Sequence, residues 1–188
     1  MRKKIVLVGK SCSGKSTLAQ QLEAYGFKPQ LSTTTRPIRD YEKQGVDYNF
    51  ISEETFKKME QNGEFVETDN FVGWYYGLTH KDFNDADILI LTPRGLYKYL
   101  QSFPKENFLI IYIETSKELR HTRIQDRGDG YDNADRRWVA DDLDFNNWEQ
   151  WGMPWDMKIS LQTEDTIPNL INILISKNKT IKNYGTEN

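Results

Sequence analysis

A glycine-rich segment near the start of the chain limits the possible folds more than any other feature. It reads Gly9-Lys10-Ser11-Cys12-Ser13-Gly14-Lys15-Ser16: two glycines with four residues between them, then a lysine and a hydroxyl residue. Glycines let a backbone close around phosphate with its N–H groups pointing inward. The lysine can reach β- and γ-phosphates, and the serine hydroxyl can bind Mg²⁺. The segment therefore predicts a phosphate-binding loop.

The residues on either side of this loop support that prediction. Loops of this type lie between a strand and a helix. The apolar run 5–8 before the loop is rich in β-branched residues, which is typical of a buried parallel strand. Residues 17–25 after it carry Leu18, Ala19 and Leu22 at helical spacing, and a glycine ends the pattern. The expected order of strand, loop and helix is present.

Strand and helix patterns alternate along most of the chain. Further strand-like runs occupy 88–91, 108–113 and, more weakly, 157–161, and helical patterns occupy 96–100, 116–126, 134–148 and 166–177. This alternation predicts an α/β fold of the P-loop NTPase type, with a parallel sheet flanked by helices. Ligands of such sheets bind beyond the carboxyl ends of the strands, where the phosphate-binding loop also lies.

The segment 32–83 departs from this alternation. It is polar, rich in aromatic and turn residues, and carries only one predicted helix, at 53–62. We interpret it as a small insert beside the nucleotide site. The expected organisation is one domain, 1–188, with a core formed by 1–31 and 84–178 and a flexible tail at 178–188.

Composition argues against several classes of protein. A net charge of −3 and a pI of about 5.5 argue against a nucleic-acid-binding surface, which would be basic. The single cysteine, Cys12, leaves no internal disulfide and fits a reducing compartment. No apolar run approaches the roughly 18 residues that span a bilayer. We expect a cytoplasmic protein that binds neither nucleic acid nor membranes and works as a monomer or a homodimer.

The insert contains residues suited to a second phosphate group. Arg36 and Arg39 lie three residues apart, with a proline that stiffens the loop between them. Guanidinium groups bind phosphate oxygens in pairs and keep their charge at any working pH. Tyrosine hydroxyls follow at Tyr48 and Tyr76 and can donate to phosphate. A carboxylate, of which the insert has several, can accept two N–H bonds from one edge of a guanine.

These motifs, in this order and spacing, resemble those of the guanylate kinase family. The similarity covers the phosphate-binding loop and nearly all of the insert, through Thr34-Thr35-Arg36-Pro37-Ile38-Arg39, Asp47-Tyr48-Asn49-Phe50, Gly63-Glu64-Phe65-Val66-Glu67 and Tyr75-Tyr76-Gly77. It is weaker after residue 83. The family transfers the γ-phosphoryl group of ATP to GMP or dGMP. The resemblance therefore implies a nucleoside monophosphate kinase with ATP as co-substrate and Mg²⁺ as cofactor.

The resemblance also implies roles for individual residues. On the substrate side, the monophosphate would be held by Arg36, Arg39, Tyr48 and Tyr76, and the guanine would be read by Ser32 and Glu67. ATP would contact Gly9, Ser11, Cys12, Ser13, Gly14, Lys15, Ser16, Thr17, Arg123 and Arg127, with Ser16 as the Mg²⁺ ligand. The residues implied in catalysis are Lys15, Arg39, Arg123, Arg127 and Arg137.

An arginine-rich segment later in the chain predicts a lid over ATP. Arg120, Arg123 and Arg127 share one helix face, and a glycine-containing segment after them is typical of a hinge. We expect a helical lid at 127–136, and the resemblance implies that either Arg136 or Arg137 completes the group of arginines around the transferred phosphoryl group. For Arg120 we favour an exposed position on the helix surface.

Two positions depart from the family pattern and leave alternatives open. Leu78 stands where a small hydroxyl residue is usual, and Thr92 stands where a strand usually ends in a carboxylate. Both changes favour a deoxynucleoside monophosphate kinase with a broader or altered base preference, whereas Ser32 and Glu67 favour guanine. A non-catalytic binding module with the same fold is a further alternative, although such modules usually lack a working phosphate-binding loop. A kinase of another small phosphate ester would leave Glu67 unexplained.

Overall fold

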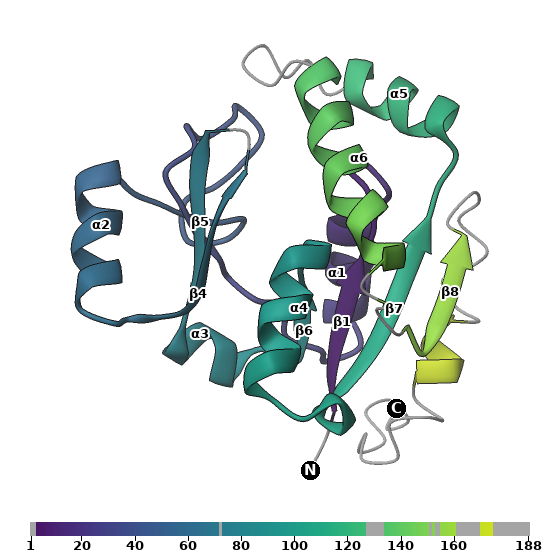
Figure 1. Cartoon of the computed structure of the whole chain (residues 1–188), viewed down its shortest axis with the longest axis horizontal. Coiled ribbons are helices and arrows are strands. Elements are labelled where there is room, and N and C mark those ends of the chain that lie inside the picture. Colours follow the sequence, from purple (N-terminus) through teal and green to yellow (C-terminus); the bar gives the residue numbers. More distant parts are fainter. Residues whose placement is uncertain are drawn as a thin grey trace, which may run out of the picture.

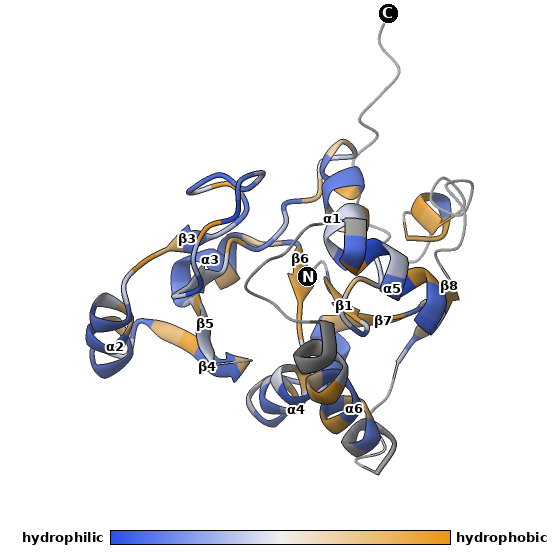
Figure 2. Ribbon diagram, turned by 90° about the horizontal axis from the view of Figure 1, so that it is seen from above, coloured by the Kyte–Doolittle hydropathy of each residue, from blue (hydrophilic) through white to orange (hydrophobic). Residues whose placement is uncertain are grey.

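The core of the protein is a four-stranded parallel sheet. The computed structural model describes residues 3–71, 73–126, 134–150, 152, 155–160 and 170–174. Its strands in spatial order are β6 (Ile88–Ile90), β1 (Lys4–Val8), β7 (Phe108–Glu114) and β8 (Met157–Ser160), and each neighbouring pair is parallel. Figure 2 shows β1, β6 and β7 as the most hydrophobic ribbons of this region. The predicted α/β fold is confirmed, including the weakly predicted strand near residue 157.

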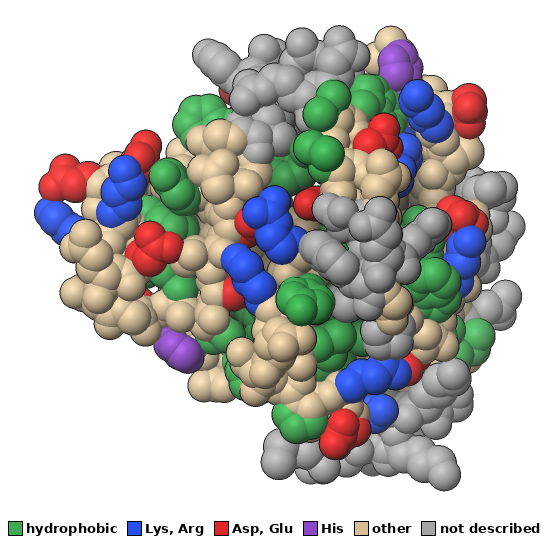
Figure 3. Space-filling model, in the orientation of Figure 1, with side chains coloured by type: hydrophobic (Ala, Val, Ile, Leu, Met, Phe, Trp, Pro, Cys, Tyr) green, Lys and Arg blue, Asp and Glu red, His purple; other side chains and the backbone are tan. Residues whose placement is uncertain are grey.

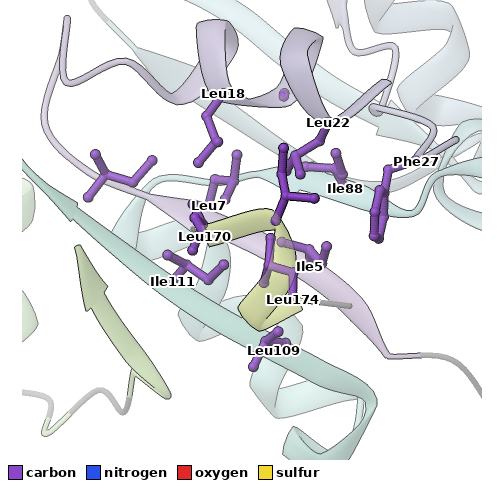
Figure 4. Close-up of a cluster of buried hydrophobic side chains, with 13 residues drawn as sticks. Ile5, Leu7, Leu18, Leu22, Phe27, Ile88, Leu109, Ile111, Leu170 and Leu174 are labelled. Carbon is purple, nitrogen blue, oxygen red and sulfur yellow. The ribbon is translucent and has the colours of Figure 1, made fainter. Parts of the chain in front are cut away.

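Helices cover both faces of this core sheet. Helix α1 (Lys15–Glu23) packs Leu18 and Leu22 on one face, together with Leu170 and Leu174 from the helical stretch 170–174 (Figure 4). Helices α4 (Pro93–Ser102) and α6 (Ala134–Gln150) pack on the other face. The central strand residues are fully buried because both faces are covered, which explains their continuous apolar run.

Aromatic side chains pack between β7, the end of α6 and the segment before β8. Trp148 of α6 is 3 % exposed, and its ring lies 6.1 Å from that of Tyr112 on β7 and 5.9 Å from that of Trp155. Asp156 then accepts a hydrogen bond from the Ile110 N–H at 2.8 Å, which fixes the chain entering β8. The tryptophans described in this part of the sequence therefore pack the fold together.

A second, smaller sheet lies beside the core sheet (Figure 1). Its strands in spatial order are β3 (Asn49–Phe50), β2 (Thr33–Thr34), β5 (Trp74–Thr79) and β4 (Phe65–Phe71). It is accompanied by α2 (Glu53–Gln61) and α3 (His80–Asp85). The expectation of only one helix in this segment was wrong. The strands were missed because two are only two residues long and β4 carries polar residues on both faces.

The lid and the tail fall mainly outside the described residues. Helix α5 (Lys117–Asp126) leads toward the predicted lid, of which 127–133 are outside the described part, as is the tail 178–188. A short 3₁₀ helix, η1 (Lys105–Asn107), precedes β7. Among the helices that the structure describes, none combines the length and apolar character needed to cross a bilayer.

Candidate active site

The predicted phosphate-binding loop has the backbone shape that its glycines permit. Gly14 has φ 102°, a left-handed conformation, and ends the loop as the N-cap of α1. Gly9 is closely packed: a Cβ there would lie 2.6 Å from the Ile113 carbonyl oxygen and from Ser13 Oγ. Ser13 Oγ is itself buried without a hydrogen-bond partner in the described residues. These positions explain why the loop needs glycine at both ends.

The loop presents Lys15 at the start of α1. Its Nζ donates to the carbonyl oxygens of Gly9 at 2.6 Å and Lys10 at 3.0 Å. No side chain caps this helix start and its first turn has no acidic residue, so the positive end of the helix dipole is not offset there. Ser16 and Thr17 are exposed in that first turn. The arrangement suits a polyphosphate.

Ser16 also fits the predicted role in binding Mg²⁺. No group of three or more His, Cys, Asp or Glu side chains that could hold a metal occurs within the described ranges. Mg²⁺ commonly keeps several water ligands and is bound through substrate phosphates plus one or two protein oxygens. A single exposed hydroxyl beside a phosphate-binding loop is compatible with that kind of coordination.

The two arginines of the insert are held together by a carboxylate that the sequence analysis did not identify. Glu42 Oε1 accepts from Arg36 Nη2 at 2.7 Å and from Arg39 Nη1 at 3.3 Å, and Oε2 accepts from the Arg39 N–H at 3.0 Å. Burial alone would raise the pKa of Glu42, but these hydrogen bonds outweigh it and lower the pKa. Glu42 therefore stays charged and orients both guanidinium groups.

Tyr48 and Tyr76 lie next to this arginine pair, as predicted. Their rings meet edge to face at 6.1 Å, and the Arg36 guanidinium lies 5.6 Å from the Tyr48 ring. Burial raises the pKa of Tyr48 to about 12, so its hydroxyl stays protonated and can donate to an anion. The structure thus brings the four predicted phosphate ligands into one cluster.

Ser32 is oriented by a neighbour two residues earlier. Its Oγ accepts from Gln30 Nε2 at 2.6 Å, and Gln30 Oε1 accepts from the Ile90 N–H at 3.2 Å at the end of β6. Because Ser32 Oγ accepts this bond, its own hydroxyl hydrogen can point elsewhere and donate to a carbonyl oxygen such as guanine O6.

Glu67 lies close to Ser32 in the small sheet. It pairs across strands with Leu78, whose neighbour Gly77 pairs with Thr33, next to Ser32. The Glu67 Oε2 atom is buried without a hydrogen-bond partner in the described chain. Burial raises the pKa of this carboxyl to about 7, a shift that nearby Lys98 opposes and Asp69 reinforces. A buried, unpaired acceptor is costly unless a ligand supplies donors.

The two unusual positions have structural roles. Leu78 is 1 % exposed and belongs to the core on the second face of the core sheet, beside Glu67. Thr92 caps α4 by accepting from the Gly95 N–H at 3.0 Å, and its Oγ1 lies 3.5 Å from Asp69 Oδ2. A carboxylate therefore does reach the end of β6, although it comes from β4 instead of from β6 itself.

The arginines near the lid are only partly described. Arg123 Nη1 donates to the Cys12 carbonyl oxygen at 3.1 Å and so contacts the phosphate-binding loop. Arg127 lies outside the described residues, and Arg136 and Arg137 lie in the first turn of α6 without described side chains. The surface position favoured for Arg120 was wrong: this residue is 5 % exposed and pairs with Asp141 on α6 at 3.1 Å.

Three contributors to the site were missed by the sequence analysis. They are Glu42, Gln30 and Asp69. Glu42 follows Arg39 by three residues, a spacing that could have indicated an ion pair. Gln30 is only two residues from Ser32, but its contact with Ile90 spans 60 residues and that of Asp69 with Thr92 spans 23, so only the fold brings these two pairs together.

Comparisons with known proteins place this chain in a family. A family model described as guanylate kinase matches residues 1–92. A guanylate kinase from Thermosynechococcus vestitus is 36 % identical over 146 residues, covering 72 % of this chain and 75 % of that protein. One from Prochlorococcus marinus is 34 % identical over 73 % of this chain and 79 % of its own length.

A solved structure agrees with these sequence comparisons. The crystal structure of guanylate kinase from Anaplasma phagocytophilum matches with a TM-score of 0.69 at 25 % identity, covering 94 % of this chain and 86 % of that one. The chain belongs to the guanylate kinase family.

Proposed function

We propose that this protein transfers the γ-phosphoryl group of ATP to GMP or dGMP, giving ADP and GDP or dGDP. The observation that carries the choice of base is Glu67, whose buried Oε2 has no partner in the described residues and whose pKa is raised to about 7. Guanine offers two adjacent N–H donors that suit such an acceptor. Adenine lacks this donor edge.

The residues divide between the two substrates. Lys15 and the phosphate-binding loop suit the phosphates of ATP, while the Arg36 and Arg39 pair with Tyr48 and Tyr76 suits the monophosphate. Phosphoryl transfer has a loose transition state, so positioning and charge stabilisation supply most of the catalysis. Mg²⁺ held by Ser16 and the phosphates would neutralise part of the developing charge.

Ser32 and Glu67 would read the guanine from two sides. Ser32 can donate to O6 because Gln30 occupies its acceptor position, and Glu67 can accept from N1 and the exocyclic amine. Leaving a buried polar group unpaired with the wrong base is the strongest form of discrimination available to a pocket. We further propose that the protein acts in the cytoplasm, as a monomer or a homodimer.

The alternatives are less well supported. Leu78 is part of the core and Thr92 is a helix cap, so neither substitution by itself indicates a pocket for another base. A binding module without activity would not need Lys15 resting on the carbonyls of its own loop. The charges on the face in Figure 3 are of both signs and closely interspersed, without one continuous basic region.

ADP release from ATP and Mg²⁺ tests the proposal. The purified protein is assayed with GMP, dGMP, AMP, dAMP, CMP, UMP and dTMP. We expect activity with GMP and dGMP, at least a hundredfold less with the other bases (an estimate of about 10² or more for an unpaired polar group). Lys15→Ala is expected to lose activity by orders of magnitude while keeping its fold by circular dichroism. Equal turnover of AMP and GMP would contradict the base assignment.

A further inference from the structure

The carboxylate of Asp141 on α6 binds the phosphate-binding loop directly. Its Oδ1 and Oδ2 both accept from the Ser11 N–H, at 3.0 and 2.9 Å, and Oδ1 also accepts from Ser11 Oγ at 3.0 Å. The Asp141 side chain is only 6 % exposed. No role proposed above for either nucleotide requires this residue.

Arg120 on α5 balances the charge of Asp141. Its Nη1 donates to Asp141 Oδ2 at 3.1 Å, and the Trp138 ring lies 4.4 Å from the guanidinium carbon. A buried ion pair costs much of its own attraction in lost hydration, so it is weak evidence of a purely stabilising role. Here Asp141 also accepts a hydrogen bond from the backbone of the phosphate-binding loop, at the Ser11 N–H.

One peptide unit connects Asp141 to Lys15. The peptide between Lys10 and Ser11 donates its N–H to Asp141 and accepts the Lys15 ammonium group at its carbonyl oxygen, at 3.0 Å. The peptide group is planar, so a carboxylate that fixes the N–H also fixes the direction of the carbonyl. The ammonium group proposed to contact the ATP phosphates therefore donates to an oxygen whose orientation depends on Asp141.

We propose that Asp141 is a positioning residue for ATP. Held in place by Arg120, it fixes the Lys10–Ser11 peptide and, through that peptide, the ammonium group of Lys15. The inference rests on the proposed function for the identity of the nucleotide. It goes beyond that function by giving a role to α6, which begins within the predicted lid, in shaping the phosphate-binding loop.

The variant Asp141→Asn distinguishes positioning from a simple charge effect. If the carboxylate acted only through its charge, removing it would leave more positive charge near the loop and lower the KM for ATP. If it positions the loop, the KM for ATP rises. We expect a rise of about tenfold or more, the scale of a hydrogen bond to a charged group. The KM for GMP should stay within about twofold.

Two further variants separate this role from stability. In Arg120→Met/Asp141→Val, apolar side chains replace the whole ion pair, an exchange that buried pairs often tolerate. We expect a melting temperature close to that of the wild type with the KM for ATP still raised about tenfold. Asp142→Asn is the matched control: this neighbouring carboxylate is exposed and, among the residues that the structure describes, pairs with the Lys10 side chain at 3.0 Å, so its loss should leave both KM values unchanged.

Binding of ATP with Mg²⁺ by calorimetry, without any monophosphate, keeps this test independent of the proposed function. If the wild type binds ATP but phosphorylates no guanine nucleotide, the proposed function fails while the Asp141 variants still report on the loop. Weaker ATP binding in Asp141→Asn and in the double variant, with normal binding in Asp142→Asn, supports the inference. Unchanged or tighter ATP binding in both Asp141 variants would overturn it, as would a lower kcat with both KM values unchanged.

Discussion

At the scale of single residues, Glu67 shows how burial prepares a side chain for its ligand. Its carboxyl is shielded from water beside Leu78, and this burial raises its pKa to about 7. Near neutral pH the free protein therefore holds this group partly protonated. Two N–H donors on a ligand stabilise only the ionised form, so binding of guanine and loss of the proton are coupled.

This coupling predicts a pH dependence. Below about pH 7 the protonated Glu67 must lose its proton to accept both N–H groups, so kcat/KM for GMP should fall up to tenfold for each further pH unit. Rates measured from pH 5 to 9 in the wild type and in Glu67→Gln test this. The substrate phosphate titrates near pH 6 in both proteins. In Glu67→Gln only the inflection of the kcat/KM profile near pH 7 should vanish. If that inflection persists, it belongs to another group.

The same raised pKa has a consequence for stability. The folded protein holds this proton more tightly than the unfolded chain, so ionisation of Glu67 destabilises the fold. The stability that the protonated carboxyl contributes is fully present below about pH 4.5, is lost progressively as the pH rises to about 7, and is absent above that. Glu67→Gln should therefore be at least as resistant to urea as the wild type at pH 8, although it discriminates less well against adenine.

At the scale of elements, the segment between β2 and β3 is built around one buried carboxylate. Glu42 is 5 % exposed and holds Arg36 and Arg39 in place of the anion that they are suited to bind. Arg36 is further enclosed by the rings of Tyr48 and Phe50. The segment has little regular structure, so these polar contacts set its shape.

Removing the charge of Glu42 should damage both stability and substrate binding. In Glu42→Gln the buried Arg36 loses its ionic partner, which we expect to lower the free energy of unfolding by about 3 kcal/mol. The KM for GMP should rise about tenfold while the KM for ATP stays unchanged. Urea denaturation and steady-state kinetics measure the two effects. Glu53→Gln, at an exposed pair with Lys57, should change neither, and an unaffected KM for GMP in Glu42→Gln would contradict the role given to this loop.

The sequence allowed the core elements to be predicted better than the contacts that complete the site. The run 5–8 and the phosphate-binding loop follow from local pattern alone, because a buried parallel strand must be apolar throughout. Asp69 could not be predicted, since it reaches Thr92 only through the pairing of β4 with β5. Arg120 was misjudged because charged residues on a polar helix usually face water, and its partner Asp141 lies on a different helix.

At the scale of the whole molecule, the proposed substrate ligands lie on two sheets. Residues for the monophosphate belong to the small sheet and its loops, and those described for ATP belong to the loop after β1 of the core sheet, to α1 and, for Arg123, to α5. Each nucleotide should therefore stabilise the folded state by itself. At about 100 times its Kd, either one adds about 2.7 kcal/mol to the free energy of unfolding.

This gain in the free energy of unfolding predicts a rise in melting temperature of about 5–10 °C for a chain of this size. Calorimetric scans with GMP alone, with ATP and Mg²⁺ alone, and with neither ligand provide the measurement. AMP at the same concentration as GMP is the matched control and should give a smaller shift. Equal shifts with the two monophosphates would argue against the assigned roles of Ser32 and Glu67.

The contact between α5 and α6 also has a spectroscopic consequence. The Trp138 indole on α6 lies against three side chains of α5: it is parallel to the His121 ring within 7°, and its centroid is 4.4 Å from the Arg120 guanidinium carbon and 5.8 Å from Lys117 Nζ. The emission of an indole responds to charged and aromatic neighbours. The difference in emission between the wild type and Trp138→Phe would therefore isolate the signal of Trp138. This signal reports the spacing between the two helices, can be followed while the nucleotides bind, and needs no attached label.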